Sequence, residues 1–286
     1  MHAPAETPTT SRRTEPEGPW AGLAGRSHGD PAARGCPIVF LHGLTFDHHM
    51  WDPVIEALPS SHPTIAFDLP GHGSSASLLR PGLAPAIDAI HAAVQEAQLD
   101  PPILVGHSIG GPLATLYAAQ HPTAGVLSIN APLRIEPFAE LLRSLHNQLA
   151  CDGFASAWSM FQTSMQMELL PAAARALLKA SDRPGDERLQ QQVLAYQADL
   201  LHGPLEEVVR WRDAGMSRLR DTGIPYLTLH SNCIDRSDRA WLSDRLPNAE
   251  ILVWPVGHHF PHLSDPTRFA ALVTGFAAAA VGRSQR

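Results

Sequence analysis

The sequence predicts an α/β protein in which helices flank a mostly parallel central sheet. Short apolar runs bounded by Gly or Pro alternate with segments of helical periodicity, a pattern typical of strands that are buried on both faces. The chain has 286 residues, of which 44% are hydrophobic, and this is enough for the core of one large domain. Alternating strands and helices favour parallel strands joined by right-handed crossovers.

The elements can be assigned in chain order. Residues 1–18 are rich in Pro, Thr, Glu and Arg and lack periodicity, so we expect a flexible tail ahead of a domain that spans 19–286. A short edge strand is expected over 20–26. Six apolar runs are then predicted as strands: 37–41, 64–67, 103–106, 126–129, 226–229 and 251–254. Between them, apolar residues recur at helical spacing, for example over 87–94.

The alternation stops between 131 and 221, where apolar helical patterns occur without a convincing strand. We expect a helical cap inserted there, at the carboxyl edge of the sheet, where parallel sheets bind ligands. Four of its apolar side chains are candidates for the wall of a substrate pocket: Trp158, Met160, Phe161 and Met165. Their helical spacing also fits the alternative that they form the core of the insertion itself.

The strongest local signal is GHSIGG at 106–111, which lies directly after an apolar run and directly before a helical pattern. In so tight a strand-to-helix turn the central residue adopts a strained backbone, and Gly is needed on both sides because neighbouring segments pass close by. Ser108 would therefore project from the sheet edge as a nucleophile. A serine nucleophile needs a base within hydrogen-bond reach, and the base needs an orienting carboxylate. The segment GHHFPH at 257–262 offers three histidines for that role.

Together these motifs resemble the α/β-hydrolase superfamily, and in particular its capped, carboxylesterase-like members with a Ser-His-Asp triad. The likeness extends to three further segments: VFLHG at 39–43, FDLPGHG at 67–73, and FPHL at 260–263 with a following Asp-Pro. It implies the α/β-hydrolase fold, with the catalytic base at His259 and His258 as the reserve candidate. It also implies that the backbone N–H groups of Leu44 and Ile109 form an oxyanion hole.

The resemblance places the triad acid in the loop after the next-to-last strand. That loop reads HSNCIDRSD over 230–238, so Asp235 is the expected acid and Asp238 the reserve. The loop departs from the family pattern in two ways. Ser231 stands where the family usually has Gly, and the spacing to Asp235 is one residue longer than usual.

Ser rather than Asp at the nucleophile position points to acyl chemistry. The expected function is a serine hydrolase that cleaves a small or medium apolar carboxylic ester through an acyl-enzyme intermediate, with no cofactor and no metal ion. A lactonase, a thioesterase or a cofactor-free perhydrolase with the same triad would carry the same motifs. The alternative from another class is a non-catalytic protein that binds a small molecule on the same fold.

Composition argues against several other classes of function. The chain has 21 Lys and Arg against 28 Asp and Glu, a formal net charge of −7, which is unfavourable for binding nucleic acid. No apolar run has the length of a membrane span or signal peptide, and the three cysteines form no CxxC pair, so we expect a cytoplasmic protein. The 16 histidines of the chain raise the alternative of a metal hydrolase. No HExxH motif occurs, however, and His48 and His49 are expected instead in a turn at the start of a helix.

Overall fold

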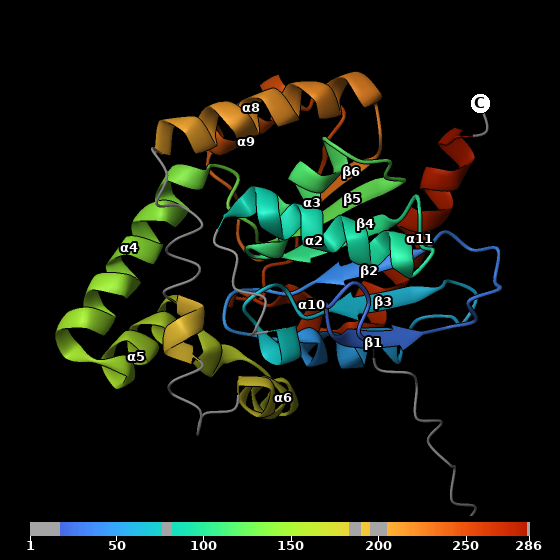
Figure 1. Ribbon diagram of the computed structural model, residues 1–286. Helices are drawn as coiled ribbons and strands as arrows, with labels where there is room; N and C mark the ends of the chain where they lie inside the picture. The colour runs from blue at the N-terminus through green and yellow to red at the C-terminus, as the bar shows by residue number, and fades with distance from the viewer. Residues whose placement is uncertain (1–17, 76–81, 183–189, 195–204, 285–286) are drawn as a thin grey trace, which may run out of the picture.

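The computed structural model describes residues 18–75, 82–182, 190–194 and 205–284. Within these residues, seven strands form one sheet in the order β1-β3-β2-β4-β5-β6-β7, and every neighbouring pair is parallel except β1 with β3 (Figure 1). The strands are β1 (Gly25–His28), β2 (Ile38–Leu41), β3 (Thr64–Phe67), β4 (Ile103–His107), β5 (Gly125–Ile129), β6 (Tyr226–His230) and β7 (Glu250–Val253). The predicted α/β fold with a mostly parallel sheet is confirmed.

The central strands β2 to β6 are buried along their whole length, which is why their sequences are continuous apolar runs without alternation. The six strands predicted from these runs lie within one residue of the observed bounds. The edge strand is the exception, because it begins at Gly25 instead of residue 20. Ala21 and Gly22 have positive φ angles of 46° and 88°, so the chain turns there and forms only an isolated bridge between Trp20 and Leu23.

Helices cover both faces of the sheet (Figure 1). On one face α3 packs on β4 and β5 and also contacts α2 and α8, whereas α1 and α11 pack together on the other face, where α11 contacts β5. The helices outside the long β5–β6 connection are α1 (Asp52–Ile55), α2 (Leu83–Glu96), α3 (Gly110–Ala118), α9 (Arg236–Arg245), α10 (Pro261–Ser264) and α11 (Pro266–Ser284), with 3-10 turns at His48–Trp51 and Gly73–Ser75. None of the described helices combines the length and apolar character that crossing a membrane requires.

The segment between β5 and β6, hereafter the helical insertion, contains helices and no strand in the residues that are described. Its elements are α4 (Ile135–Asp152), α5 (Phe154–Ser164), a 3-10 turn (Met167–Leu169), α6 (Ala172–Asp182) and α8 (Leu205–Thr222). Figure 1 shows α4, α5 and α6 to one side of the sheet, whereas α8 lies back over α3. The tail predicted over 1–18 falls, except for its last residue, outside the described part of the chain.

Candidate active site

Ser108 occupies the turn between β4 and α3 with a positive φ of 53°. Its N–H donates to the carbonyl of Ile129 at 2.9 Å, and its carbonyl accepts from the N–H of Gly111 at 3.0 Å, so both backbone groups are held. A Cβ at Gly106 would collide with the carbonyl of Gly110, and a Cβ at Gly110 would collide with the carbonyl of Leu41. The glycines around Ser108 therefore have the packing role that the sequence predicted, and the turn stores backbone strain at a single polar residue.

His259 lies in the loop between β7 and α10, two residues after Gly257, whose φ is 76°. Its N–H donates to the carbonyl of Met165 at 3.1 Å, and its carbonyl accepts from Nε2 of His107 and Nδ2 of Asn130. The imidazole Nε2 is buried and has no hydrogen-bond partner. Burial, followed by the charge of His258, lowers the pKa of His259 to about 4, and no carboxylate of the described residues acts on this pKa. The imidazole is therefore neutral at pH 7, with a nitrogen free to interact with a bound molecule.

Ser108 and His259 line the same cavity, which has a volume of about 400 Å³. Loops after β2, β4, β5, β6 and β7 form one side of it, and α4 and the end of α5 form the other. The lining residues are Leu44, Ser108, Asn130, Ala131, Pro132, Pro137, Phe138, Leu141, Phe161, Met165, His230, Ser231, Asn232, Cys233, Ile234 and His259. The cavity thus holds Ser108 and His259 together with His230, Ser231 and Cys233. The rest of its described lining is largely apolar, and none of that lining is Lys, Arg, Asp or Glu.

The resemblance assigns the oxyanion hole to the backbone N–H groups of Leu44 and Ile109. Leu44 lines the cavity, and Ile109 directly follows Ser108 as the residue that caps the N-terminus of α3. The first N–H groups of a helix have no acceptor within the helix. In the described part of the chain, neither N–H donates to a backbone oxygen in a turn or loop. Both remain candidates for donors to a developing negative charge.

The expected acid Asp235 is not among the cavity residues, although its neighbour Ile234 is. Asp235 is the N-cap of α9, where its Oδ1 accepts from the N–H of Asp238 at 2.7 Å and from the hydroxyl of Ser237 at 2.7 Å. These hydrogen bonds lower the pKa of the exposed Asp235 carboxyl. The reserve candidate Asp238 forms an ion pair with Arg134, with 2.7 Å between Oδ1 and Nε. The structure therefore brings neither carboxylate together with His259.

Within this loop Ile234 lines the cavity, whereas Asp235 starts α9. The sequence Asp-x-Ser-Asp ahead of a helical segment also fits an N-cap. This capping signal is local, whereas the expectation of a triad acid came from the family order.

The other predicted site residues divide into two groups. Phe161 and Met165 line the cavity, as expected. Trp158 and Met160 are partly buried against the core, and Trp158 stacks on Phe161 with ring centroids 5.5 Å apart. For these two residues the alternative reading, packing within the insertion, agrees with the structure. The reserve base His258 is turned away from the cavity lining, with Nε2 2.9 Å from the hydroxyl of Ser264 and Nδ1 accepting from the N–H of Phe260.

A model of the alpha/beta hydrolase family matches residues 38–272. The chain belongs to this family. The match spans the sheet from β2 onward, the turn at Ser108 and the loop of His259, which are the parts of this α/β hydrolase that form the cavity.

Curated relatives of this α/β hydrolase match only over a short segment. An 87-residue segment is 40% identical to the pimeloyl-[acyl-carrier protein] methyl ester esterase of Neisseria meningitidis serogroup B, covering 30% of this chain and 31% of that protein. A 103-residue segment is 36% identical to the magnesium-chelatase 30 kDa subunit of Rhodobacter capsulatus, covering 35% of this chain and 36% of that protein. The chain thus spans about a third of the length of the curated relatives it matches.

Similarity to solved structures extends over nearly the whole fold. The enol-lactonase from Burkholderia xenovorans LB400 superposes with a TM-score of 0.69 at 18% identity, covering 92% of this chain and 100% of that chain. At this identity the likeness concerns the fold alone.

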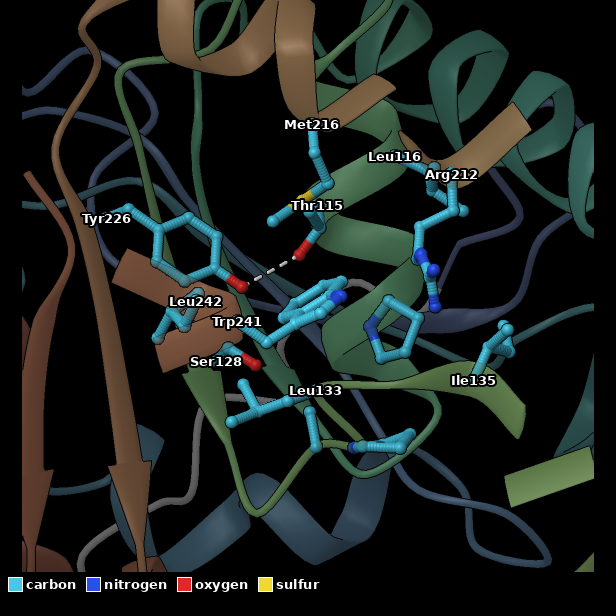
Figure 2. A pocket seen from close by; sticks show the side chains of 13 residues that line it. Thr115, Leu116, Ser128, Leu133, Ile135, Arg212, Met216, Tyr226, Trp241 and Leu242 are labelled. Atoms are coloured by element: carbon cyan, nitrogen blue, oxygen red, sulfur yellow. Dashed lines mark hydrogen bonds between the residues drawn. The ribbon is translucent and has the colours of Figure 1, made fainter. Parts of the chain in front are cut away.

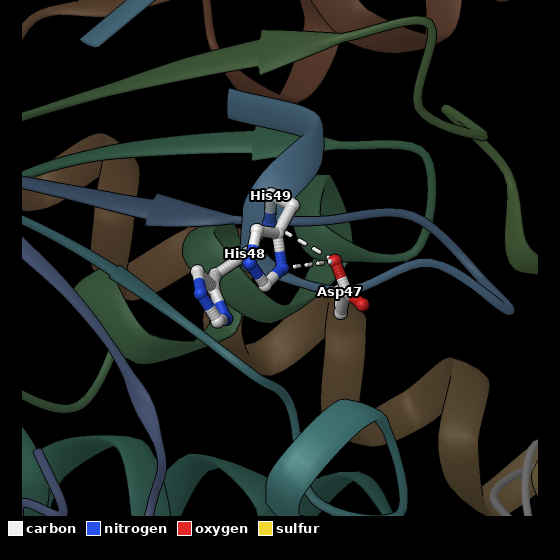
Figure 3. A group of neighbouring side chains, drawn as sticks. All are labelled: Asp47, His48 and His49. Atoms are coloured by element: carbon white, nitrogen blue, oxygen red, sulfur yellow. Dashed lines mark hydrogen bonds and ion pairs between the residues drawn. The ribbon is translucent and has the colours of Figure 1, made fainter. Parts of the chain in front are cut away.

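One group of side chains in the described residues has the spacing of metal ligands: Asp47, His48 and His49, with one potential ligand atom of each within 4.8 Å of the others (Figure 3). Their polar atoms are largely engaged with one another and with Asp68. Asp47 accepts from both the N–H and Nδ1 of His49, and His48 Nδ1 lies 2.7 Å from Asp68. Asp68 also accepts from the N–H groups of His48 and Ser74. The group forms the turn expected from the sequence, and Asp68 fixes the loops beside it.

A second hollow lies between α3, β6, α8 and α9 (Figure 2). Its volume is about 30 Å³, which is room for little more than one water molecule. The hydroxyls of Thr115 and Tyr226 meet there at 3.1 Å. It contains no serine–histidine pair, so we assign the candidate active site to the larger cavity.

Proposed function

We propose that this α/β hydrolase is a serine hydrolase that cleaves a small or medium apolar carboxylic ester through an acyl-enzyme intermediate. The observation that carries the proposal is the shared cavity: Ser108, strained in its turn, and His259, with a buried and unpartnered Nε2, both line it. A strained nucleophile beside a neutral imidazole is the arrangement that acyl transfer requires.

The proposed reaction has two steps. The Oγ of Ser108 attacks the ester carbonyl carbon while Nε2 of His259 takes the hydroxyl proton, and the N–H groups of Leu44 and Ile109 stabilise the resulting oxyanion. Collapse of this intermediate breaks the bond to the alcohol, which leaves with the proton from His259. A water molecule then attacks the acyl-enzyme with His259 again as base, releasing the acid and restoring Ser108.

The composition of the cavity lining favours a substrate without charge. Phe138, Leu141, Phe161 and Met165 face the site from α4 and α5, and the described lining has no cationic side chain that could pair with a substrate carboxylate. Burying a charge without a partner is strongly unfavourable, so esters that carry a free carboxylate near the acyl group are expected to be poor substrates. Because Phe161 and Met165 belong to the helical insertion, we also propose that this segment acts as the cap of the active site.

The acid of the triad remains a prediction from the sequence. Asp235 retains the expected chain order, after Ser108 and before His259, and this order is its support. Its capping of α9 and the lack of any carboxylate effect on His259 favour a reaction that relies on the Ser108–His259 pair. The same lack favours the second candidate, a binding protein on this fold that does not turn substrate over.

Other finer points of the proposal follow from the same features. A lactone or a thioester would meet the same nucleophile, and a perhydrolase would differ only in the attacking peroxide, so these activities are alternatives for the same residues.

All three cysteines are unpaired in the structure, which is in keeping with a cytoplasmic location.

Labelling with a fluorophosphonate probe tests the proposal, together with a series of p-nitrophenyl esters of increasing acyl length. Wild type is expected to label and to turn over short esters, whereas Ser108→Ala and His259→Gln do neither. Matched controls are Ser159→Ala, at an exposed serine of α5, and His121→Gln, at a histidine stacked on His91 away from the cavity. Wild type that binds an ester analogue without labelling or turnover would reject the hydrolase in favour of the binding protein.

A further inference from the structure

Asn130 is the first residue after β5 and lies beside the nucleophile. In the sheet Ile129 pairs with His107, so the residues that follow them, Asn130 and Ser108, emerge side by side at the carboxyl edge. Asn130 has a positive φ of 41°, which Asn tolerates better than most residues. Its N–H donates to the carbonyl of Leu229 at 2.8 Å, so the strained backbone is anchored to β6.

The Asn130 side chain joins two loops that carry cavity residues. Its Oδ1 accepts from the N–H of Ser231 at 2.8 Å, and its Nδ2 donates to the hydroxyl of Ser231 at 2.7 Å and to the carbonyl of His259 at 2.9 Å. The N–H of Ser231 can only donate and the carbonyl of His259 can only accept, so the orientation of the Asn130 amide is determined by its partners.

The carbonyl of His259 accepts a second hydrogen bond, from Nε2 of His107 at 2.9 Å. Since a carbonyl only accepts, Nε2 of His107 carries the proton, and burial lowers the pKa of His107 so that the ring is neutral. The N–H of His259 in turn donates to the carbonyl of Met165. The main chain of His259 is therefore held by three hydrogen bonds, two of them from side chains beside the nucleophile turn.

We propose that Asn130 is a positioning residue that holds His259 in register with Ser108, with His107 as the second donor. This inference rests on the proposed function and deepens it, because it assigns the placement of the base to contacts with its backbone. In a triad, a carboxylate orients the imidazole through Nδ1. Here the described residues provide no carboxylate to His259. The hydrogen bonds from Asn130 and His107 to the carbonyl of His259 place the ring instead.

Two variants test the role with residues that tolerate the positive φ at position 130. Asn130→Asp retains the acceptor for Ser231 but sets an oxygen against the carbonyl of His259 in place of the donor. Asn130→Gly removes the whole side chain and accepts the positive φ. The matched control is Asn248→Asp, the same chemical change at an exposed position.

Steady-state kinetics with the best p-nitrophenyl ester should separate placement of the base from binding. Misplacement of a catalytic group by about 1 Å costs on the order of 100-fold in rate, so kcat should fall about 100-fold in both variants while KM stays within about 2-fold. Active-site titration should show that the fraction of competent enzyme is unchanged, and the control should match wild type. A wild-type kcat, a change confined to KM, or an activity loss matched by the loss of titrated sites would each overturn the proposal.

An NMR readout separates failure of this inference from failure of the proposed function. The imidazole signals of His259 are assigned by their loss in His259→Gln and compared in a Ser108→Ala background, where no turnover is needed. Asn130→Gly is expected to move the signals of His259 and leave those of His91 and His121 in place. Unmoved His259 signals overturn the positioning role whether or not the protein hydrolyses esters.

Discussion

The pH profile of kcat/KM distinguishes an isolated imidazole at His259 from one paired with a carboxylate. The base must be neutral to accept the proton of Ser108, so the acid limb of the profile reports the pKa of His259 in the free enzyme. Burial lowers this pKa to about 4. The sign follows directly: a lowered pKa keeps the base competent to lower pH, so the acid limb moves below its ordinary position near 6.5.

The size of the effect makes the experiment decisive. With a pKa of about 4, roughly 0.9 of the enzyme has a neutral base at pH 5, whereas an ordinary value of 6.5 leaves only about 0.03. The ratio of kcat/KM at pH 5 to that at pH 8 therefore differs about 30-fold between the two cases. We expect a nearly flat profile from pH 5 to pH 8.

The assay is initial-rate hydrolysis of a neutral ester whose leaving group is detected at a single wavelength insensitive to pH. Samples held at pH 5 and returned to pH 8 should recover full activity, which controls for acid unfolding. A midpoint between pH 6 and 7 would refute the reasoning, because an acidic partner would then be raising the pKa of His259. In that case Asp235 would be the first residue to examine.

Two further predictions concern the carboxylates. The substitution Asp235→Asn keeps a side chain that caps helices as well as Asp does, so kcat should stay within about 3-fold of wild type. A fall in kcat of about 10⁴-fold, as for a triad acid, would show that Asp235 orients His259 during catalysis. Asp68→Asn replaces an acceptor of three hydrogen bonds from His48 and Ser74, and urea unfolding at pH 7 should show a loss of about 2–4 kcal/mol. Burial alone would raise the pKa of Asp68, but the interactions with His48 outweigh burial and lower that pKa. The stabilisation by the ionised Asp68 is therefore present above pH 3.8 and is lost on acidification. The difference in unfolding free energy between wild type and Asp68→Asn should narrow below about pH 4, and a difference that widens there would contradict the assignment.

The fold could be predicted from the sequence because its information is local. A strand buried on both faces is a short apolar run, and the turn at Ser108 needs Gly wherever neighbouring carbonyls approach it. These are properties of a few adjacent residues. The positions of the five central strands β2 to β6 and of the Ser108 turn followed from them.

The rest of the site depends on contacts between distant segments. Asn130 and His259 are 129 residues apart in the chain, and nothing in the sequence around Asn130 marks it except its place directly after a predicted strand. Asp235 shows the opposite case. Ile234 reaches the cavity and Asp235 does not, and motif order does not resolve a difference of one position.

The hydrogen bond from the N–H of His259 to the carbonyl of Met165 has a consequence for engineering this α/β hydrolase. Met165 is the C-cap of α5 and lines the cavity, and its carbonyl also holds the loop that carries His259. Exchanging this segment for one from a relative would alter turnover as well as selectivity, because the new segment must supply a carbonyl at the same point. Libraries that diversify the pocket wall should therefore keep the main-chain path at residue 165 and vary only the side chains around it.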